Sequence, residues 1–222
     1  MSLRKRFFAA MYDGQMRRSE KAGLTDMRIA LVAHAEGTVL EIGAGTGANL
    51  GHYRPAATSL TLTEPDVYMC RRLERRAQAV APSALVLRAP AEDLPFDDGT
   101  FDTVVSTLVL CGVDDQPRAM REIRRVLRPG GRFLFLEHVR ADDPSVARKQ
   151  DKMNRVNRAV VCCDCNRPTL GTIEAAGFEV TELERTELPK APSFARPAIL
   201  GVALAPTAPS ARTPGHSVTT PH

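Results

Sequence analysis

The nine residues Val39-Leu40-Glu41-Ile42-Gly43-Ala44-Gly45-Thr46-Gly47 decide the fold of this chain. They begin as an apolar run, which predicts a strand, and pass directly into glycines at three alternate positions. Glycine has no Cβ and adopts positive φ, so such a loop lets a ligand lie against bare backbone. We expect Ala48, Asn49 and Leu50 to open a helix over 48–55, whose first amides point back at this ligand.

An acidic residue after the next strand narrows the ligand class. Glu64 follows the predicted strand 59–63, near the offset of ~20 residues at which an acidic side chain reaches a ribose diol. A dinucleotide loop prefers G-x-G-x-x-G, whereas Gly47 comes one residue early and position 48 is alanine. Glu41 is also out of place beside a pyrophosphate, but it suits a positively charged sulfonium with an α-amino group. A tight turn in some other doubly wound domain stays an alternative.

Composition excludes several classes of protein. With 222 residues, 43% hydrophobic and 25% charged, the chain has the length and balance of one α/β domain. The net charge of +4 is spread over probable helix faces, so we expect no nucleic-acid partner. We find no apolar run that could span a membrane and no signal peptide, and predict a cytoplasmic protein without integral membrane association. Five cysteines without an export signal argue against disulfides.

Strand and helix patterns alternate along the chain, as a parallel sheet requires. We predict a Rossmann-like, doubly wound, mostly parallel seven-stranded α/β sheet with an antiparallel last strand and helices on both faces. The expected strands lie at 38–42, 59–63, 84–87, 101–107, 132–137, 178–184 and 198–204. The expected helices lie within 1–36 and at 48–55, 66–80, 114–128, 145–160 and 168–176. We divide the chain into an N-terminal helical cap (1–36), a main domain (37–205) and a disordered tail (206–222).

The glycine loop resembles a known cofactor motif. Its pattern, Glu41-x-Gly43-x-Gly45-x-Gly47, is similar to motif I of the class I S-adenosylmethionine (AdoMet)-dependent methyltransferases. The likeness continues over roughly 37–140. Glu64-Pro65-Asp66 resembles the ribose-binding strand end of that family, and 91–102 resembles the A-E-x-L-P-F-x-D-x-S-F-D run of the ubiquinone-biosynthesis type (methyltransferase type 11). Arg125–Gly131 resembles the family's R-V-L-R-P-G-G turn, which is scaffold.

This resemblance implies AdoMet as the cofactor and assigns its contacts. The predicted cofactor site consists of Tyr12, Glu41, Gly43, Ala44, Gly45, Gly47, Asn49, Glu64, Pro65, Ala91, Glu92, Thr107 and Leu108. Adenine contacts fall on Ala91 and Glu92, because the position where the family commonly has aspartate is Pro90 here. Tyr12 either folds over the cofactor or packs in the core.

Three smaller features are similar to the methyltransferase-like alkyl thiol methyltransferases: Thr107–Val113, Glu137–Val139 and Cys165-Asn166. That family carries an N-terminal membrane helix that we do not find here. The likeness therefore does not assign the acceptor, but it points to small lipophilic thiols or related molecules. We therefore predict S-methylation of a small apolar thiol. O- or C-methylation of a quinone, phenol or other aromatic product stays open, as do a non-catalytic AdoMet-binding protein and a nicotinamide oxidoreductase, which the loop spacing disfavours. The oligomeric state stays open.

The acceptor pocket is predicted from residues beyond the strand ends: Cys111, His138, Cys162 and Cys165. His138 follows the strand 132–137 and has an ordinary pKa near neutrality, so it is the candidate general base. Alternatively, Glu137 and His138 only fix the strand end. We expect no metal site, because the cysteines at 162, 163 and 165 lack the second spaced pair typical of zinc patterns.

Overall fold

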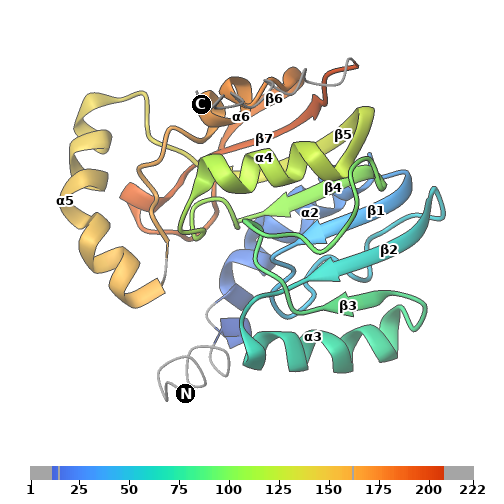
Figure 1. Cartoon of the computed structure of the whole chain (residues 1–222). Helices are drawn as coiled ribbons and strands as arrows, with labels where there is room; N and C mark the ends of the chain where they lie inside the picture. Colours follow the sequence, from blue (N-terminus) through green and yellow to red (C-terminus); the bar gives the residue numbers. More distant parts are fainter. Residues whose placement is uncertain (1–11, 15, 162, 208–222) are drawn as a thin grey trace, which may run out of the picture.

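A seven-stranded sheet in the order β3-β2-β1-β4-β5-β7-β6 organises the chain (Figure 1). The computed structural model describes residues 12–14, 16–161 and 163–207. The strands are β1 (Gly37–Ile42), β2 (Ala57–Thr63), β3 (Leu85–Leu87), β4 (Phe101–Thr107), β5 (Leu127–His138), β6 (Glu179–Glu187) and β7 (Pro197–Leu204). The first five pair in parallel, and β7 is antiparallel to both β5 and β6. This topology confirms the predicted fold class.

Helices cover both faces of the sheet (Figure 1). They are η1 (Glu20–Leu24), α2 (Thr25–Val32), α3 (Val67–Val80), α4 (Gln116–Val126), α5 (Pro144–Val161), α6 (Thr169–Ala175) and the short η2 (Ser193–Ala195). Alternate strand residues point to opposite faces. Accordingly Val104 joins the core cluster under α4 and α6, while its neighbour Val105 joins the cluster under α2. Among the described residues, no helix is long and apolar enough to cross a membrane.

Local capping residues explain where the helices begin. Asp66 accepts hydrogen bonds from the backbone nitrogens of Tyr68 and Met69, at 2.9 and 3.1 Å, and so starts α3. Asp115 accepts one from Arg118 at 2.9 Å and starts α4. An aspartate that satisfies the first free amides of a helix is a strong N-cap. Both helix starts confirm the sequence prediction within a residue or two.

The predicted helix over 48–55 is wrong. The chain there forms successive turns, closed by the backbone bonds Gly47 N to Ala44 O (2.8 Å), Leu50 N to Gly47 O (3.3 Å) and His52 N to Asn49 O (2.9 Å). Each of these bonds spans three residues, whereas an α-helix requires four. Gly47 has φ +84°, outside the helical region. The loop after β1 therefore continues farther than its glycine pattern suggests.

Strand β5 begins at Leu127, five residues before the predicted start at 132. Leu127 pairs with Phe101, and the register then shifts before Thr103 pairs with Arg132. The Pro-Gly-Gly sequence at 129–131 thus forms an irregularity within the strand rather than a separate turn. Of the predicted disordered tail, residues 208–222 lie outside the described part of the chain.

Candidate functional site

The carboxyl ends of four neighbouring strands meet at one edge of the sheet. β1 ends at Ile42, β2 at Thr63, β4 at Thr107 and β5 at His138, and these strands lie in the order β2-β1-β4-β5. In Figure 1 the arrowheads of β1, β2 and β4 point to the side on which α5 lies. Open α/β sheets bind their ligands at this edge. The residues that follow these strand ends therefore form the candidate site.

The glycines of the loop after β1 have different surroundings. Gly43, Gly45 and Gly47 all have positive φ, at +54°, +60° and +84°. A Cβ on Gly43 would lie 2.6 Å from Cγ1 of Val109, and one on Gly47 would lie 2.5 Å from a leucine side chain. Of the residues that the structure describes, a Cβ on Gly45 would meet only the ring of Tyr12, at 4.0 Å. Gly43 and Gly47 therefore permit close packing of the loop, whereas a contact between the Gly45 backbone and a ligand stays a prediction.

Glu64 lies beside the Gly45 backbone. Its Oε2 accepts a hydrogen bond from the Gly45 nitrogen at 3.0 Å, and its Oε1 accepts one from the Asp66 nitrogen at 2.9 Å. The side chain is 6% exposed, and this burial raises its pKa against the two backbone donors. Each carboxylate oxygen retains further acceptor capacity. A ribose diol fits this arrangement, since it offers two hydroxyl donors to one carboxylate.

The start of the described chain covers the loop. Asp13 Oδ1 accepts a hydrogen bond from Thr46 Oγ1 at 2.5 Å, and Asp13 Oδ2 pairs with Arg72 at 3.4 Å. Burial raises the pKa of the adjacent Tyr12 hydroxyl, whose ring lies over Gly45. Tyr12 is thus placed where the sequence predicted a residue folding over the cofactor. A contact between them stays a prediction.

A buried arginine, which we did not predict, supports the site from α2. Arg28 is 3% exposed. Its Nη1 donates to Thr107 Oγ1 at 2.9 Å and to Asn49 Oδ1 at 3.3 Å, and its Nε donates to Glu20 Oε1 at 3.1 Å. Arg28 therefore joins the end of β4 to the glycine loop. A signal was present in the sequence: Arg28 follows one buried leucine by four residues and precedes another by three, so it lies on the apolar face of the helix.

Glu41 lies beneath the glycine loop. Its Oε1 accepts from Asn49 Nδ2 at 2.9 Å, and its Oε2 accepts from the Tyr53 hydroxyl at 2.6 Å. Burial raises its pKa to about 7, although the hydrogen bonds from Tyr53 and Asn49 and the charge of Arg28 oppose this change. In this arrangement Glu41 holds Asn49 and the loop in place. A direct contact between Glu41 and a charged cofactor stays a prediction.

The residues after β4 form a strained turn. Leu108 has φ +61°, which is uncommon for a residue with a branched side chain. Glu137 stabilises this turn, since it accepts hydrogen bonds from Ser106 Oγ at 2.6 Å and from the Val109 and Leu110 nitrogens at 3.0 Å each. This supports the interpretation of Glu137 as a residue that fixes the strand end. The turn directs the following residues toward the end of β5.

Two cysteines and a histidine come together beyond these strand ends. Cys111, His138 and Cys163 place their potential ligand atoms within 4.8 Å of one another. The Cys111 thiol beside it lowers the pKa of Cys163 to about 5 against the effect of burial, and His138 adds to this lowering. Burial opposes protonation of His138, but Cys163, Glu137 and the Ala195 backbone together raise the histidine's pKa. The cluster thus favours a thiolate on Cys163 and raises the pKa of Cys111.

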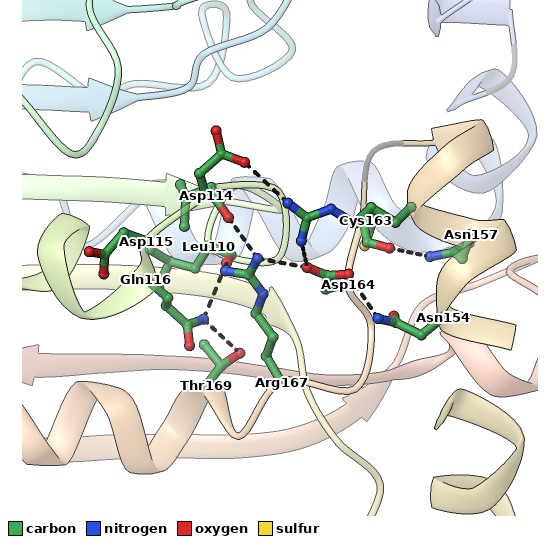
Figure 2. A network of polar contacts seen from close by, with 12 residues as sticks. Leu110, Asp114, Asp115, Gln116, Asn154, Asn157, Cys163, Asp164, Arg167 and Thr169 are labelled. Carbon is green, nitrogen blue, oxygen red and sulfur yellow. Dashed lines mark hydrogen bonds and ion pairs between the residues drawn. The ribbon is translucent and has the colours of Figure 1, made fainter. Parts of the chain in front are cut away.

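The segment that carries Cys163 is anchored to the loop that carries Cys111 (Figure 2). The Asp164 nitrogen donates to the Cys111 carbonyl at 2.8 Å. Asn157 Nδ2 donates to the Cys163 carbonyl at 2.6 Å, and Arg167 Nη2 donates to Asp164 Oδ2 at 2.7 Å. These bonds hold the two cysteines close together although they are distant in the sequence.

The structure separates the cysteines that we assigned to the acceptor pocket. Cys111 and His138 belong to the cluster, as described. Cys165 does not join it: the residue is fully buried, its carbonyl accepts from Gln150 Nε2 at 2.8 Å, and burial raises its pKa to about 11. Cys163, which the prediction omitted, takes the place expected for Cys165. Cys162 lies outside the described residues.

The two residues predicted to contact adenine are Ala91, which is buried, and Glu92. Pro65, in the turn predicted beside the ribose, is exposed. Glu92 Oε1 accepts from the backbone nitrogens of Asp114 and Asp115 at 2.7 and 3.3 Å. Glu92 thus holds the turn that starts α4, a role the sequence did not indicate. Its contact with adenine stays a prediction.

A cavity of about 1100 Å³ lies elsewhere, between α4 and α6. None of the predicted site residues lines it. Size alone is a weaker guide to a ligand site than convergent polar groups with perturbed pKa values. We therefore place the candidate site at the strand ends.

Known proteins resemble this chain over the part that contains the glycine loop and the ends of β1, β2 and β4. Residues 40–135 match the family model of a methyltransferase domain. The chain is 29% identical to the human thiol S-methyltransferase TMT1A over 204 residues, which are 89% of this chain and 82% of that protein. It is 34% identical to the human thiol S-methyltransferase TMT1B over 158 residues, which are 68% of this chain and 64% of that protein.

The fold is also found among solved structures. A SAM-dependent methyltransferase of Thermotoga maritima, described as a possible histamine N-methyltransferase, superimposes with a TM-score of 0.68. The superposition covers 92% of this chain and all of the other, at 23% identity. At this identity the likeness establishes the fold and leaves the acceptor open.

Proposed function

Because the chain is a class I S-adenosylmethionine-dependent methyltransferase, we propose that it transfers the methyl group to the sulfur of a small, apolar thiol. One observation carries this proposal: the similarity to TMT1A extends over 204 residues, far beyond the cofactor-binding core at 40–135. The shared region thus includes segments after β5, where acceptor specificity resides. The name of that relative describes a thiol S-methyltransferase.

The cofactor site follows from the strand ends. Bound AdoMet supplies a methyl group on a sulfonium sulfur that is a good leaving group. We assign the ribose hydroxyls to Glu64, whose carboxylate two backbone donors already hold in place. We assign the backbone of Gly45 and the ring of Tyr12 to the same end of the ligand, since this ring lies 4.0 Å from the position of a Gly45 Cβ.

The remaining predicted contacts keep their assignments. Thr107 and Leu108 lie at the end of β4, where we place the methionine part of the cofactor, and Arg28 fixes the Thr107 hydroxyl. Ala91 and Glu92 are assigned to the adenine, and Pro65 to the turn beside the ribose. The chain's main contribution to rate is then to hold the acceptor at attack distance, because orientation converts a bimolecular step into an effectively unimolecular one.

A thiol acceptor must lose its proton before it attacks, since the thiolate is the nucleophile. Cys111, His138 and Cys163 are titratable side chains that come together past the ends of β4 and β5. We therefore place proton removal at this cluster, with His138 as the predicted base. A thiol, with an ordinary pKa of about 8.5, needs less help than a phenol at about 10.

An acceptor panel tests this function. The purified protein is incubated with methyl-labelled AdoMet and with matched pairs of an alkyl or aryl thiol and the alcohol or phenol of the same carbon skeleton. We expect methylation of the thiols, with no product from their oxygen analogues. Methylation confined to phenols, quinols or carbon acceptors would overturn the thiol proposal. Binding of S-adenosylhomocysteine, followed by calorimetry, shows that the protein used is intact.

A further inference from the structure

The Cys111–His138–Cys163 cluster has the donor set of a transition-metal site. Its three residues come from three separate parts of the chain: the loop after β4, the end of β5 and the segment after α5. Thiolate and imidazole groups are the ligands that zinc prefers in proteins. The spacing of these cysteines in the sequence gives no hint of this, because the three ligands meet only after folding.

The geometry of the cluster is close to that of a zinc site. The three potential ligand atoms lie within 4.8 Å of one another. In a tetrahedral site with zinc–sulfur bonds of about 2.3 Å, two sulfur ligands lie about 3.8 Å apart. Shifts of about one ångström, within the range of side-chain rotation, would complete the site.

A second observation points to a ligand. The Nδ1 atom of His138 is buried and has no hydrogen-bond partner among the described residues. A buried polar atom without a partner destabilises the folded state. The imidazole lies beside Cys163 and the Ala195 backbone, and a metal ion bound at Nδ1 would give this atom a partner as well. Cys111 is also almost fully buried, so water does not compete strongly for these donors.

The surroundings hold the ligands in place. Asp164 and Asn157 fix the backbone on either side of the cluster, through the Cys111 and Cys163 carbonyls. Asp164 is itself held by Arg167 and by Asn154 Nδ2 at 2.8 Å (Figure 2). Such outer contacts orient metal ligands and raise metal affinity.

We propose that Cys111, His138 and Cys163 bind one zinc ion and leave its fourth tetrahedral position open. Among the described residues, the group contains no fourth cysteine, histidine or carboxylate side chain. Structural zinc sites have four protein ligands, whereas catalytic sites have three and keep one position for water or substrate. The donor count therefore indicates a site that binds an exchangeable ligand.

The exchangeable ligand is the acceptor thiol, and this step rests on the proposed function. A thiol that coordinates zinc loses its proton, so the proton passes to solvent and the thiolate sulfur stays bound to the metal. That sulfur then forms the new bond to the methyl carbon as the bond between this carbon and the sulfonium sulfur breaks. When zinc is bound, His138 is a zinc ligand. The zinc ion then promotes loss of the thiol proton, a role that we assigned above to His138 as a base.

Metal binding is tested on the reduced full chain. The protein is stripped of metal and titrated with Zn²⁺ against a chelating indicator, and with Co²⁺ to follow thiolate-to-metal charge-transfer absorption. We expect one equivalent of each ion. Cys111→Ser, Cys163→Ser and His138→Gln should weaken zinc binding by more than about 100-fold, beyond the typical effect of losing an outer contact. Cys70→Ser, a buried cysteine on α3, is the matched control and should bind zinc normally.

Binding of S-adenosylhomocysteine to each variant shows whether the fold is intact. The proposal would be overturned if a Cys111→Ser/Cys163→Ser variant that still binds S-adenosylhomocysteine bound zinc as tightly as the wild-type protein does. So would a reduced protein that binds no zinc, with Cys111 and Cys163 forming a disulfide on oxidation. Added thiol should change the spectrum of the cobalt form. A cobalt spectrum lost in the variants but unaffected by any thiol would support the metal site and overturn the thiol acceptor.

Discussion

The backbone nitrogen of Gly45 donates a hydrogen bond to Oε2 of Glu64 at 3.0 Å. This bond joins the glycine loop after β1 to the residue that follows β2. The other carboxylate oxygen accepts from the Asp66 nitrogen at the start of α3. One side chain thus sets the relative position of a loop, a strand end and a helix terminus, and it presents a charged acceptor where we place the ribose.

Replacing Glu64 tests the ribose site. We expect Glu64→Ala to weaken binding of S-adenosylhomocysteine by about 1–3 kcal/mol, because the ribose hydroxyls lose a charged acceptor. Calorimetric titration measures this change. Glu184→Ala removes an exposed carboxylate on β6 and should leave the affinity unchanged. Unchanged affinity in Glu64→Ala would remove this residue from the ribose site.

Two glycine substitutions separate loop packing from ligand contact. Both Gly43 and Gly45 have positive φ, so an alanine at either position costs about 1–2 kcal/mol. At Gly43 the new Cβ would also lie 2.6 Å from Val109, which adds strain. Thermal unfolding should therefore show a lower Tm for Gly43→Ala than for Gly45→Ala.

Although Gly45→Ala should be the less destabilised of the two variants, it should bind the ligand more weakly than the wild-type protein. A methyl group at Gly45 has space in the ligand-free protein, but it fills the face where we place the cofactor. We expect Gly45→Ala to bind S-adenosylhomocysteine about tenfold more weakly than the wild-type protein, or worse, which corresponds to about 1.4 kcal/mol. If Gly45→Ala bound it normally, the bare backbone at this position would not be a ligand surface.

Arg28 should be important for stability as well as for the site. Arg28→Met removes the donor that Glu20, Asn49 and Thr107 share. Breaking a buried ion pair destabilises a protein by about 3–5 kcal/mol, and we expect the lower end, about 3 kcal/mol, because Glu20 keeps some contact with solvent. Urea denaturation measures the free energy of unfolding, with the exposed Arg18→Met as a control. A loss no larger than that of the control would contradict the role of Arg28 in the network.

The strands of the sheet could be predicted from the sequence because the patterns that specify them lie within short stretches of the chain. The apolar run of β4 and the aspartates that start α3 and α4 act through neighbouring residues, and all are found where they were expected. The error over 48–55 arose where the backbone bonds of successive turns replace those of a helix. In that loop the Asn49 side chain donates hydrogen bonds to Glu41 and Thr107. Helix propensities of neighbouring residues cannot predict such contacts, because Thr107 is distant in the sequence.

The site was predicted only in part, since several of its contacts are long-range. Glu64 and the glycines could be found by their offset from strand ends. Arg28 reaches Thr107 across 79 positions, and Cys163 meets Cys111 and His138 only through the anchoring of the segment after α5. Spacing within the cysteine group at 162–165 suggested no zinc pattern, because two of the three clustered ligands lie elsewhere in the chain.

Glu41 gives the folded state a distinct dependence on pH. Its ordinary pKa is 4.5, and burial raises the folded-state pKa to about 7. Between these values the folded protein binds more protons than the unfolded chain, so this residue makes stability fall as pH rises. The groups that face it are the Tyr53 hydroxyl, the Asn49 amide and the Arg28 guanidinium. A pKa difference of this size corresponds to about 3 kcal/mol.

Glu41→Gln isolates this contribution, because other titrating groups act in both proteins and cancel in the comparison. We expect the free energy of unfolding of the wild-type protein, relative to Glu41→Gln, to decrease by up to about 3 kcal/mol between pH 5 and pH 8. Urea denaturation of both ligand-free proteins at a series of pH values measures the difference. Most of the decrease should fall between pH 4.5 and 7, because the carboxyl is protonated in both states at lower pH and ionised in both at higher pH. A relative stability that rises over this range would mean that Glu41 has a lowered pKa, held as a carboxylate by Arg28, and that burial does not dominate at this position.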